Sequence, residues 1–141
     1  QLLRKKDKNK ILWCGRFLDW KHPDLAIKVA RRLLNDGISI EMEMIGTGPL
    51  FEQMGTEISR NNLEHSIKLL GTMPPDDVRL RMERAGTFLF TSDRNEGWGA
   101  VLNEAMNSGC AVVASSAAGA TPYLIRDAAN GFAYKNEEEL L

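Results

Sequence analysis

The 141-residue chain has little net charge, only two cysteines and no long apolar run. Its 18 basic and 19 acidic residues leave a formal net charge of −1, so we expect no nucleic-acid partner. The apolar runs reach only strand length, so no transmembrane helix is predicted. Cys14 and Cys110 each lie in or beside an apolar run, which predicts buried thiols rather than a disulfide or a metal site. Together these absences predict one cytoplasmic globular domain.

Three well-known ligand-binding motifs are also missing. No Gly-x-Gly-x-x-Gly follows the first predicted strand, which argues against a dinucleotide-binding dehydrogenase. No Gly-x-x-x-x-Gly-Lys-Ser/Thr loop is present, which argues against a P-loop NTPase. No Asp-x-Asp pair is available to hold a divalent metal against a diphosphate, so we expect neither a metal nor a cofactor. A cationic pair can replace such a metal, and Arg16 with Lys21 is the candidate pair.

The chain alternates between strand-like and helix-like segments. Short apolar runs are typical of parallel strands that are covered on both faces, and the intervening segments carry apolar residues at helical spacing. The predicted fold class is therefore α/β, with a doubly wound, Rossmann-like parallel sheet. The predicted strands cover residues 11–14, 40–45, 67–70, 87–91, 111–115 and 131–134. The predicted helices cover residues 23–35, 50–61, 75–85, 100–108 and 123–126.

Small or charged residues follow five of the predicted strands. In open parallel sheets, ligands bind beyond the carboxyl ends of the strands, which all lie at one edge. Five such loops at the same edge predict a large, elongated ligand that lies across it. The loops contain Gly15-Arg16 with Lys21, Gly46-Thr47-Gly48-Pro49, Gly71-Thr72-Met73, the segment 92–99, and the segment 116–120.

The segment from Glu96 to Glu104 is the most informative of these. It follows a strand-like run and contains Gly97, Trp98 and Gly99 before a helix that starts at about Ala100. Glycines let the backbone approach a ligand, and the first N–H groups of a helix favour an anion. With a rise of about 1.5 Å per helical residue, the two carboxylates would be on the order of ten Å apart. That separation suits a sugar at one end of a diphosphate and a ribose at the other.

These residues resemble a known family. The chain is similar to the carboxyl-terminal half of GT-B-fold retaining glycosyltransferases of family 4, also called group 1. The resemblance runs from about Ile11 to Tyr134. It includes the Glu-x7-Glu motif followed by Ala105-Met106 and Gly109, the Gly-Arg and Lys after the first strand, and the glycine turns after the second and third.

The resemblance implies a role for each matching position. Arg16, Lys21 and Glu96 would be catalytic: the two cations would neutralise the donor diphosphate, and Glu96 would accept hydrogen bonds from the donor sugar. Glu104 would bind the two ribose hydroxyls. The remaining substrate-binding positions would contact the donor mainly through the backbone, with Thr72 and Met73 beside the base and the second glycine turn giving it room. These positions are Gly15, Gly46, Thr47, Gly48, Thr72, Met73, Gly97, Trp98, Gly99, Ala100 and Val101.

The chain departs from the family pattern at some positions. His22 stands where the family often has glycine, and the fifth loop has Ala120 and Tyr123 in place of a glycine and a glutamate. Elsewhere the ordinary structural interpretations are preferred: Trp13 and Phe17 are predicted to be core residues.

The resemblance also implies a domain organisation. Residues 1–10 would be a linker from a missing amino-terminal acceptor domain, and residues 11–141 a carboxyl-terminally truncated domain that binds a nucleotide-sugar donor. The isolated fragment would transfer little or no sugar, and membrane association would concern only the parent enzyme. The alternatives are a non-catalytic nucleotide-sugar-binding module, or a GT-B relative such as a nucleotide-sugar epimerase or a phosphorylase. Neither the base, the sugar nor the acceptor follows from the sequence.

Overall fold

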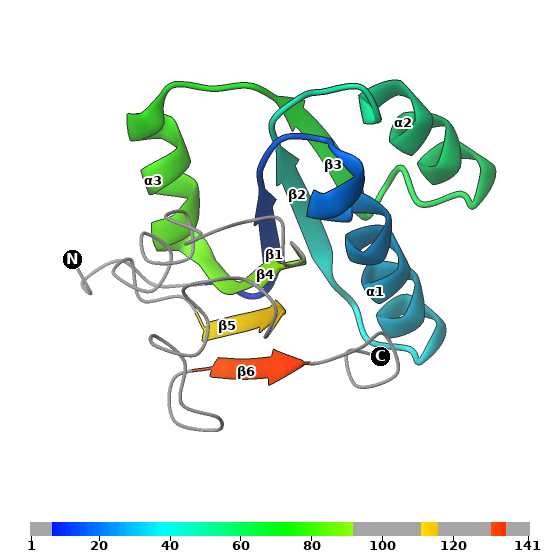
Figure 1. Cartoon of the computed structure of the whole chain (residues 1–141). Helices are drawn as coiled ribbons and strands as arrows, with labels where there is room; N and C mark the ends of the chain where they lie inside the picture. Colours follow the sequence, from blue (N-terminus) through cyan, green and yellow to red (C-terminus); the bar gives the residue numbers. More distant parts are fainter. Residues whose placement is uncertain (1–6, 92–110, 116–130, 135–141) are drawn as a thin grey trace.

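In the part of the chain that the structure describes, a six-stranded, all-parallel sheet forms the centre, in the order β3-β2-β1-β4-β5-β6 (Figure 1). The computed structural model describes residues 7–91, 111–115 and 131–134. The chain runs outward from β1 through β2 to β3, and then returns to the other side of β1 with β4. The strands are β1 (Asp7–Cys14), β2 (Glu41–Ile45), β3 (Ile67–Gly71), β4 (Ala85–Phe90), β5 (Ala111–Ser115) and β6 (Gly131–Tyr134).

Helices cover both faces of the sheet, so the predicted doubly wound α/β fold is confirmed. Two helices, α1 (Pro23–Asn35) and α2 (Phe51–Arg60), lie on one face, and α3 (Pro75–Arg84) lies on the other (Figure 1). A short 3-10 helix, η1 (Asp19–Lys21), precedes α1. No helix in these described parts of the chain is long and apolar enough to cross a membrane.

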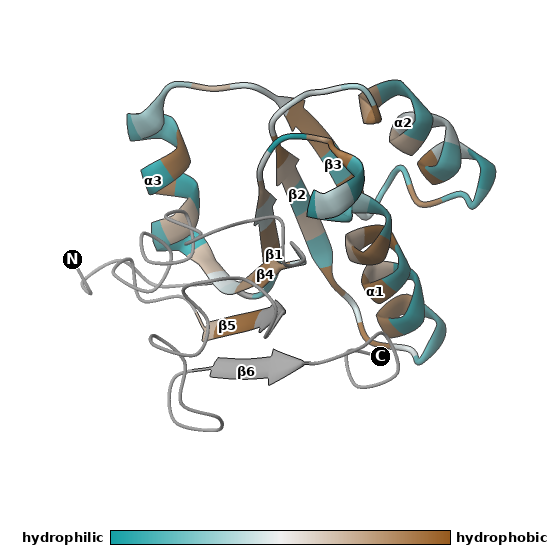
Figure 2. Cartoon of the chain, in the orientation of Figure 1, coloured by the Kyte–Doolittle hydropathy of each residue, from teal (hydrophilic) through white to brown (hydrophobic). Residues whose placement is uncertain are grey.

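Local sequence explains the form of α1. Pro23 occupies its first turn and Asp24 complements the positive end of the helix dipole. An apolar stripe faces the sheet, whereas the outer face is hydrophilic (Figure 2). Gly37 ends the helix at φ +83°, donating to the Leu34 carbonyl, a conformation that glycine adopts without strain.

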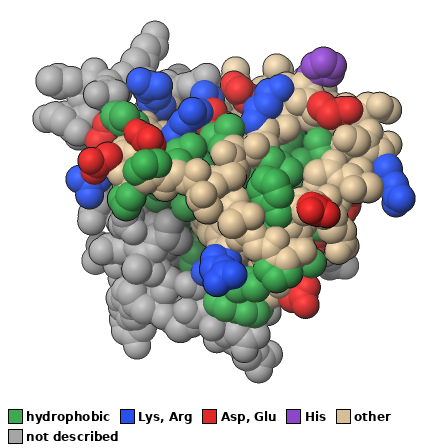
Figure 3. All heavy atoms as spheres, turned by 90° about the horizontal axis from the view of Figure 1, so that it is seen from above, with side chains coloured by type: hydrophobic (Ala, Val, Ile, Leu, Met, Phe, Trp, Pro, Cys, Tyr) green, Lys and Arg blue, Asp and Glu red, His purple; other side chains and the backbone are tan. Residues whose placement is uncertain are grey.

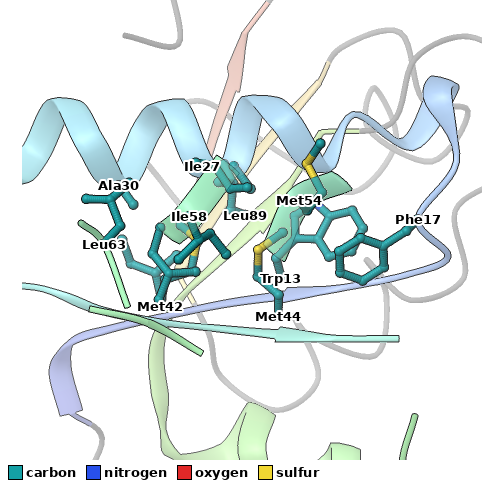
Figure 4. Packing of buried hydrophobic residues seen from close by; sticks show 13 residues of the cluster. Trp13, Phe17, Ile27, Ala30, Met42, Met44, Met54, Ile58, Leu63 and Leu89 are labelled. Carbon is teal, nitrogen blue, oxygen red and sulfur yellow. The ribbon is translucent and has the colours of Figure 1, made fainter. Parts of the chain in front are cut away.

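The larger part of the core lies between α1, α2 and the sheet (Figure 4). Trp13 and Phe17, both predicted to be core residues, are 2% and 0% exposed, and their rings meet edge to face with centroids 5.1 Å apart. The apolar stripe of α1 includes Ile27, which is buried. The other buried members of this cluster are Ile11, Ala26, Ala30, Met42, Met44, Met54, Ile58, Leu63, Ile67 and Leu89.

A smaller apolar cluster lies under α3 on the opposite face. Met82 of α3 packs there with residues of four strands, Leu12, Ile45, Phe88 and Val112. Neighbouring residues of a strand belong to opposite clusters, as Leu12 and Trp13 of β1 do. The reason is that successive side chains of a β-strand point to opposite faces of the sheet.

The strand and helix boundaries differ from the predicted ones by a few residues. β1 begins at Asp7 rather than at Ile11, so residues 7–10 belong to the strand and not to the expected linker. β4 begins at Ala85, directly after α3 and two residues earlier than predicted. β5 and β6 have the predicted bounds. The helices predicted at residues 100–108 and 123–126 lie outside the described residues.

Candidate functional site

A pocket of about 520 Å³ opens at the carboxyl edge of the sheet, where the strand order reverses on either side of β1. The chain continues from β1 to β2 on one side, whereas β4 lies on the other side of β1. Such a switch point is where ligands bind in open α/β sheets. Three loops and one residue of α3 form its wall. The lining residues are Cys14, Gly15, Arg16, Lys21, Ile45, Gly46, Thr47, Thr72, Met73 and Val78.

Backbone hydrogen bonds join the three loops beyond the ends of their strands. The Gly15 N–H donates to the Ile45 carbonyl at 3.0 Å, and the Phe17 N–H donates to the Thr47 carbonyl at 3.1 Å. On the other side, the Gly46 N–H donates to the Gly71 carbonyl at 2.8 Å. The pocket wall is therefore an extension of the sheet rather than a set of independent loops, and its shape is established before a ligand binds.

The two glycines of the second loop are required by this close approach. Gly46 has φ +126°, and a Cβ there would lie 1.8 Å from the Gly15 carbonyl oxygen. A Cβ on Gly48, at φ +158°, would lie 2.8 Å from the Phe17 nitrogen. The absence of a Cβ at these two positions makes room for the backbone of the first loop.

One end of the pocket is basic. Arg16 is exposed, and Lys21 is half-buried at the end of η1, with its Nζ atom 4.9 Å from the centroid of the Trp20 ring. The Lys21 stem passes close to the end of the first strand: a Cβ on Gly15 would lie in ordinary van der Waals contact with the Lys21 Cδ atom, at 3.7 Å. Two cations at one rim suit an anionic group such as a diphosphate.

The rest of the pocket is mainly apolar. Cys14, Ile45, Met73 and Val78 contribute side chains to it, and all of them except the buried Ile45 are partly exposed. Figure 3 views the molecule from this end of the sheet, where hydrophobic and basic side chains both reach the surface. An apolar slot beside a basic rim matches a planar base that is joined to a phosphate.

A second groove of about 420 Å³ lies between the start of α1 and α2, and its chemistry is different. Asp19, Asp24 and Glu57 line it together with Lys28 and other residues. The carboxylates make it a poor site for a diphosphate, so the pocket at the carboxyl edge is the better candidate.

The buried hydroxyl of Thr91 connects three parts of the site. Thr91 is 2% exposed and directly follows β4. Its Oγ1 accepts a hydrogen bond from the Trp13 indole N–H at 2.8 Å. The same hydroxyl lies 2.6 Å from the Lys21 carbonyl and 2.9 Å from the His22 carbonyl, to which it can donate. The basic turn before α1 is thus attached to the ends of β1 and β4.

Seven of the predicted site residues line the pocket together: Gly15, Arg16, Lys21, Gly46, Thr47, Thr72 and Met73. Gly48 does not line it and packs against the first loop. Seven others, Glu96, Gly97, Trp98, Gly99, Ala100, Val101 and Glu104, lie outside the described residues. Four residues of the site were not predicted: Cys14, Ile45, Val78 and Thr91. Cys14 and Ile45 are the last residues of β1 and β2, and the loops after these strands were predicted to bind the ligand. That position at the strand end is the one signal that could have found them.

The described residues contain no group of three or more His, Cys, Asp or Glu side chains arranged to hold a metal ion.

The fold and this pocket define a doubly wound α/β domain with a candidate ligand site at its switch point. Comparison with known proteins identifies the family, because the model of "Glycosyl transferases group 1" matches residues 1–140. The chain therefore belongs to the group 1 glycosyl transferase family, and its fold is that of one half of a GT-B glycosyltransferase.

Individual relatives agree with this assignment. The amylovoran biosynthesis glycosyltransferase AmsK of Erwinia amylovora is 33% identical over 128 residues, which cover 87% of this chain and 31% of that protein. The structure of S. aureus TarM, solved in a complex that contains UDP, has a TM-score of 0.87 at 22% identity and covers 99% of this chain and 29% of that one. Anabaena HepE in complex with UDP has a TM-score of 0.79 at 26% identity, and the match covers 94% of this chain and 37% of that one. The chain spans about a third of the length of the curated relatives that it matches.

Proposed function

We propose that this chain is the donor-binding domain of a retaining, metal-independent glycosyltransferase, which transfers a hexosyl group from a nucleotide-diphosphate sugar to a glycan, lipid or other acceptor. The observation that carries the proposal is the pocket at the switch point, where Arg16 and Lys21 border an apolar slot between the first three loops. HepE, which shares 26% identity, was solved with UDP, and this supports a nucleotide as the occupant.

The pocket suggests how the donor would be oriented. The base would enter the apolar slot beside Met73 and Val78, with the backbone of Thr72 at its edge. The diphosphate would then lie at the basic rim. This orientation places the sugar beyond the diphosphate, toward the end of β4, from which the Glu-x7-Glu segment continues.

Arg16 and Lys21 would act on the leaving group. When the bond between the sugar and the diphosphate breaks, negative charge grows on the departing phosphate oxygen, and two nearby cations stabilise that charge more in the transition state than in the bound donor. We assign Glu96 to the hydroxyls of the donor sugar and Glu104 to those of the ribose, as the family resemblance implies.

A second domain would complete the enzyme. Because the chain spans only about a third of its relatives, we propose that an amino-terminal domain of the full protein binds the acceptor and closes over the donor. The chain alone should then bind a donor but transfer no sugar. AmsK is named for amylovoran biosynthesis, and we propose a comparable role in polysaccharide synthesis, in the cytoplasm, for the full protein.

Isothermal titration calorimetry with UDP, GDP and ADP tests this proposal, with EDTA present throughout. We expect one of the three nucleotides to bind, and Glu104→Ala to weaken binding about tenfold through the lost ribose contacts. Glu52→Ala, on the exposed face of α2, is the matched control and should bind like the wild type. Binding that requires magnesium, or an unchanged affinity of Glu104→Ala, would contradict the proposal.

A product assay on the full-length protein separates transfer from the alternatives. A glycosylated acceptor is expected. Epimerised nucleotide sugar would identify an epimerase, and phosphorolysis of a glycan would identify a phosphorylase. Binding without turnover would identify a non-catalytic nucleotide-sugar-binding module.

A further inference from the structure

The turn that carries Lys21 has an unfavourable backbone conformation. His22, which follows Lys21 and precedes α1, has φ +52° and ψ +56°, in the left-handed region. A side chain there usually costs about 1–2 kcal/mol relative to glycine. A left-handed residue persists when its surroundings hold it in place, so the contacts of this turn decide where Lys21 lies.

Thr91 supplies such contacts from inside the protein. Its hydroxyl has a single proton and lies within hydrogen-bonding distance of both carbonyls of the turn, at 2.6 Å from Lys21 O and 2.9 Å from His22 O. The Trp13 indole N–H donates to the oxygen of the same hydroxyl, which leaves the hydroxyl proton free to point toward these carbonyls. Trp13 is itself held in the core by Phe17.

We propose that Thr91 is a positioning residue, which holds the Lys21–His22 turn so that the Lys21 ammonium faces the bound diphosphate. This inference rests on the proposed function, because it concerns the affinity for a nucleoside diphosphate. Thr91 itself is not among the residues that line the pocket; it acts through the backbone of Lys21. A threonine at the end of β4 thus connects the cation to the strand that leads into the Glu-x7-Glu segment.

Paired substitutions distinguish this role from simple packing. Thr91→Val keeps the shape and removes the hydroxyl, whereas Thr91→Ser keeps the hydroxyl and removes a methyl group. Loss of the hydroxyl should weaken binding of the preferred nucleotide among UDP, GDP and ADP about threefold to tenfold, while Thr91→Ser stays within about twofold of the wild type.

The Lys21→Met background is the decisive comparison. If Thr91 acts through Lys21, adding Thr91→Val to Lys21→Met should change the affinity by less than about twofold, because the group being positioned is already absent. An equal loss in both backgrounds would show that Thr91 only supports the fold, and would overturn the inference. So would an unchanged affinity of Thr91→Val in the wild-type background.

A spectroscopic measurement follows the contact itself. The Trp13 indole N–H resonance, assigned with Trp13→Phe, should move and exchange faster with solvent in Thr91→Val but not in Thr91→Ser. If the wild-type chain binds none of the three nucleotides, the proposed function fails and this inference fails with it. If the wild type binds and the double substitution shows no coupling, the positioning role alone is refuted.

Discussion

A methyl group on Gly46 should separate the first two loops of the pocket. The Cβ atom of Gly46→Ala would lie 1.8 Å from the Gly15 carbonyl oxygen and 2.9 Å from its carbonyl carbon, both backbone atoms. Ordinary contacts of this kind need about 3.5 Å, so the two segments must move apart by roughly 1.7 Å. Such a shift would break the hydrogen bonds from Gly15 to Ile45 and from Gly46 to Gly71.

The expected loss of stability combines these effects. Two lost backbone hydrogen bonds account for about 2 kcal/mol, and the φ of +126° adds strain of about 1–3 kcal/mol for alanine. We therefore expect Gly46→Ala to lower the free energy of unfolding by about 3–5 kcal/mol. Equilibrium urea denaturation, followed by far-UV circular dichroism, measures this quantity.

Gly37→Ala is the matched control. Gly37 also has a positive φ, of +83°, but a Cβ there would meet nothing within 4 Å. Gly37→Ala should therefore lower the free energy of unfolding only by the strain of a left-handed alanine, about 1–2 kcal/mol. Equal losses for the two variants would refute the claim that close contact between loops, rather than φ alone, requires glycine at position 46.

Further substitutions test three other parts of the structure. Arg81→Met should lower the free energy of unfolding by roughly 1–3 kcal/mol in urea denaturation, because the Glu43 carboxylate that Arg81 pairs with is buried and the Oε1 atom of Glu43 has no hydrogen-bond partner among the described residues. Glu43→Met removes the buried charge itself and should lower the free energy of unfolding by less. A larger decrease for Glu43→Met than for Arg81→Met would contradict the interpretation that the cost comes from the buried carboxylate left without Arg81. His22→Gly should leave the melting temperature nearly unchanged, since the relief of left-handed strain offsets the greater entropy of the unfolded chain, whereas His22→Val should lower it by several degrees. The reverse order would show that the turn is not strained. Arg16→Ala should weaken nucleotide binding about threefold to tenfold in calorimetry at low salt and reduce its salt dependence, with no change in melting temperature. An unaltered salt dependence would place Arg16 away from the phosphates.

The central strands were predictable because their composition reflects burial on both faces. The start of β1 was not, since residues 7–10 read as a charged linker. In the structure, the Lys10 Nζ atom lies 3.8 Å from Glu41 Oε1 and 3.5 Å from Glu43 Oε2, both on the neighbouring strand. Charges that pair across a sheet have the same sequence pattern as charges in solvent, so only the register distinguishes them.

The start of β4 could not be predicted from the sequence for a different reason. Ala85 and Gly86 follow α3 with no intervening loop, and a glycine at a helix end predicts a turn rather than a strand. Pairing of β4 with β1 and β5 overrides that local preference.

Much of the pocket could be predicted because glycine and charged residues after buried strands are chemically conspicuous. Val78 of α3 could not be predicted, because a valine on a helix has the same character whether it faces a core or a cavity. The Thr91 contact with Trp13 spans 78 positions in sequence, and no local pattern records such a contact. The predicted residues from Glu96 to Val101, and Glu104, remain predictions.

The central claim is that a nucleoside diphosphate binds in the pocket at the carboxyl edge of the sheet. A titration of the isotope-labelled chain with UDP, GDP and ADP, in EDTA and followed by amide chemical shifts in NMR, tests it most directly. The account predicts that one nucleotide shifts the amides of Gly15, Thr47 and Thr72 while those of Lys28 and Gln53, in the groove between α1 and α2, stay unchanged. Shifts confined to that groove, or no shifts with any of the three nucleotides, would contradict it.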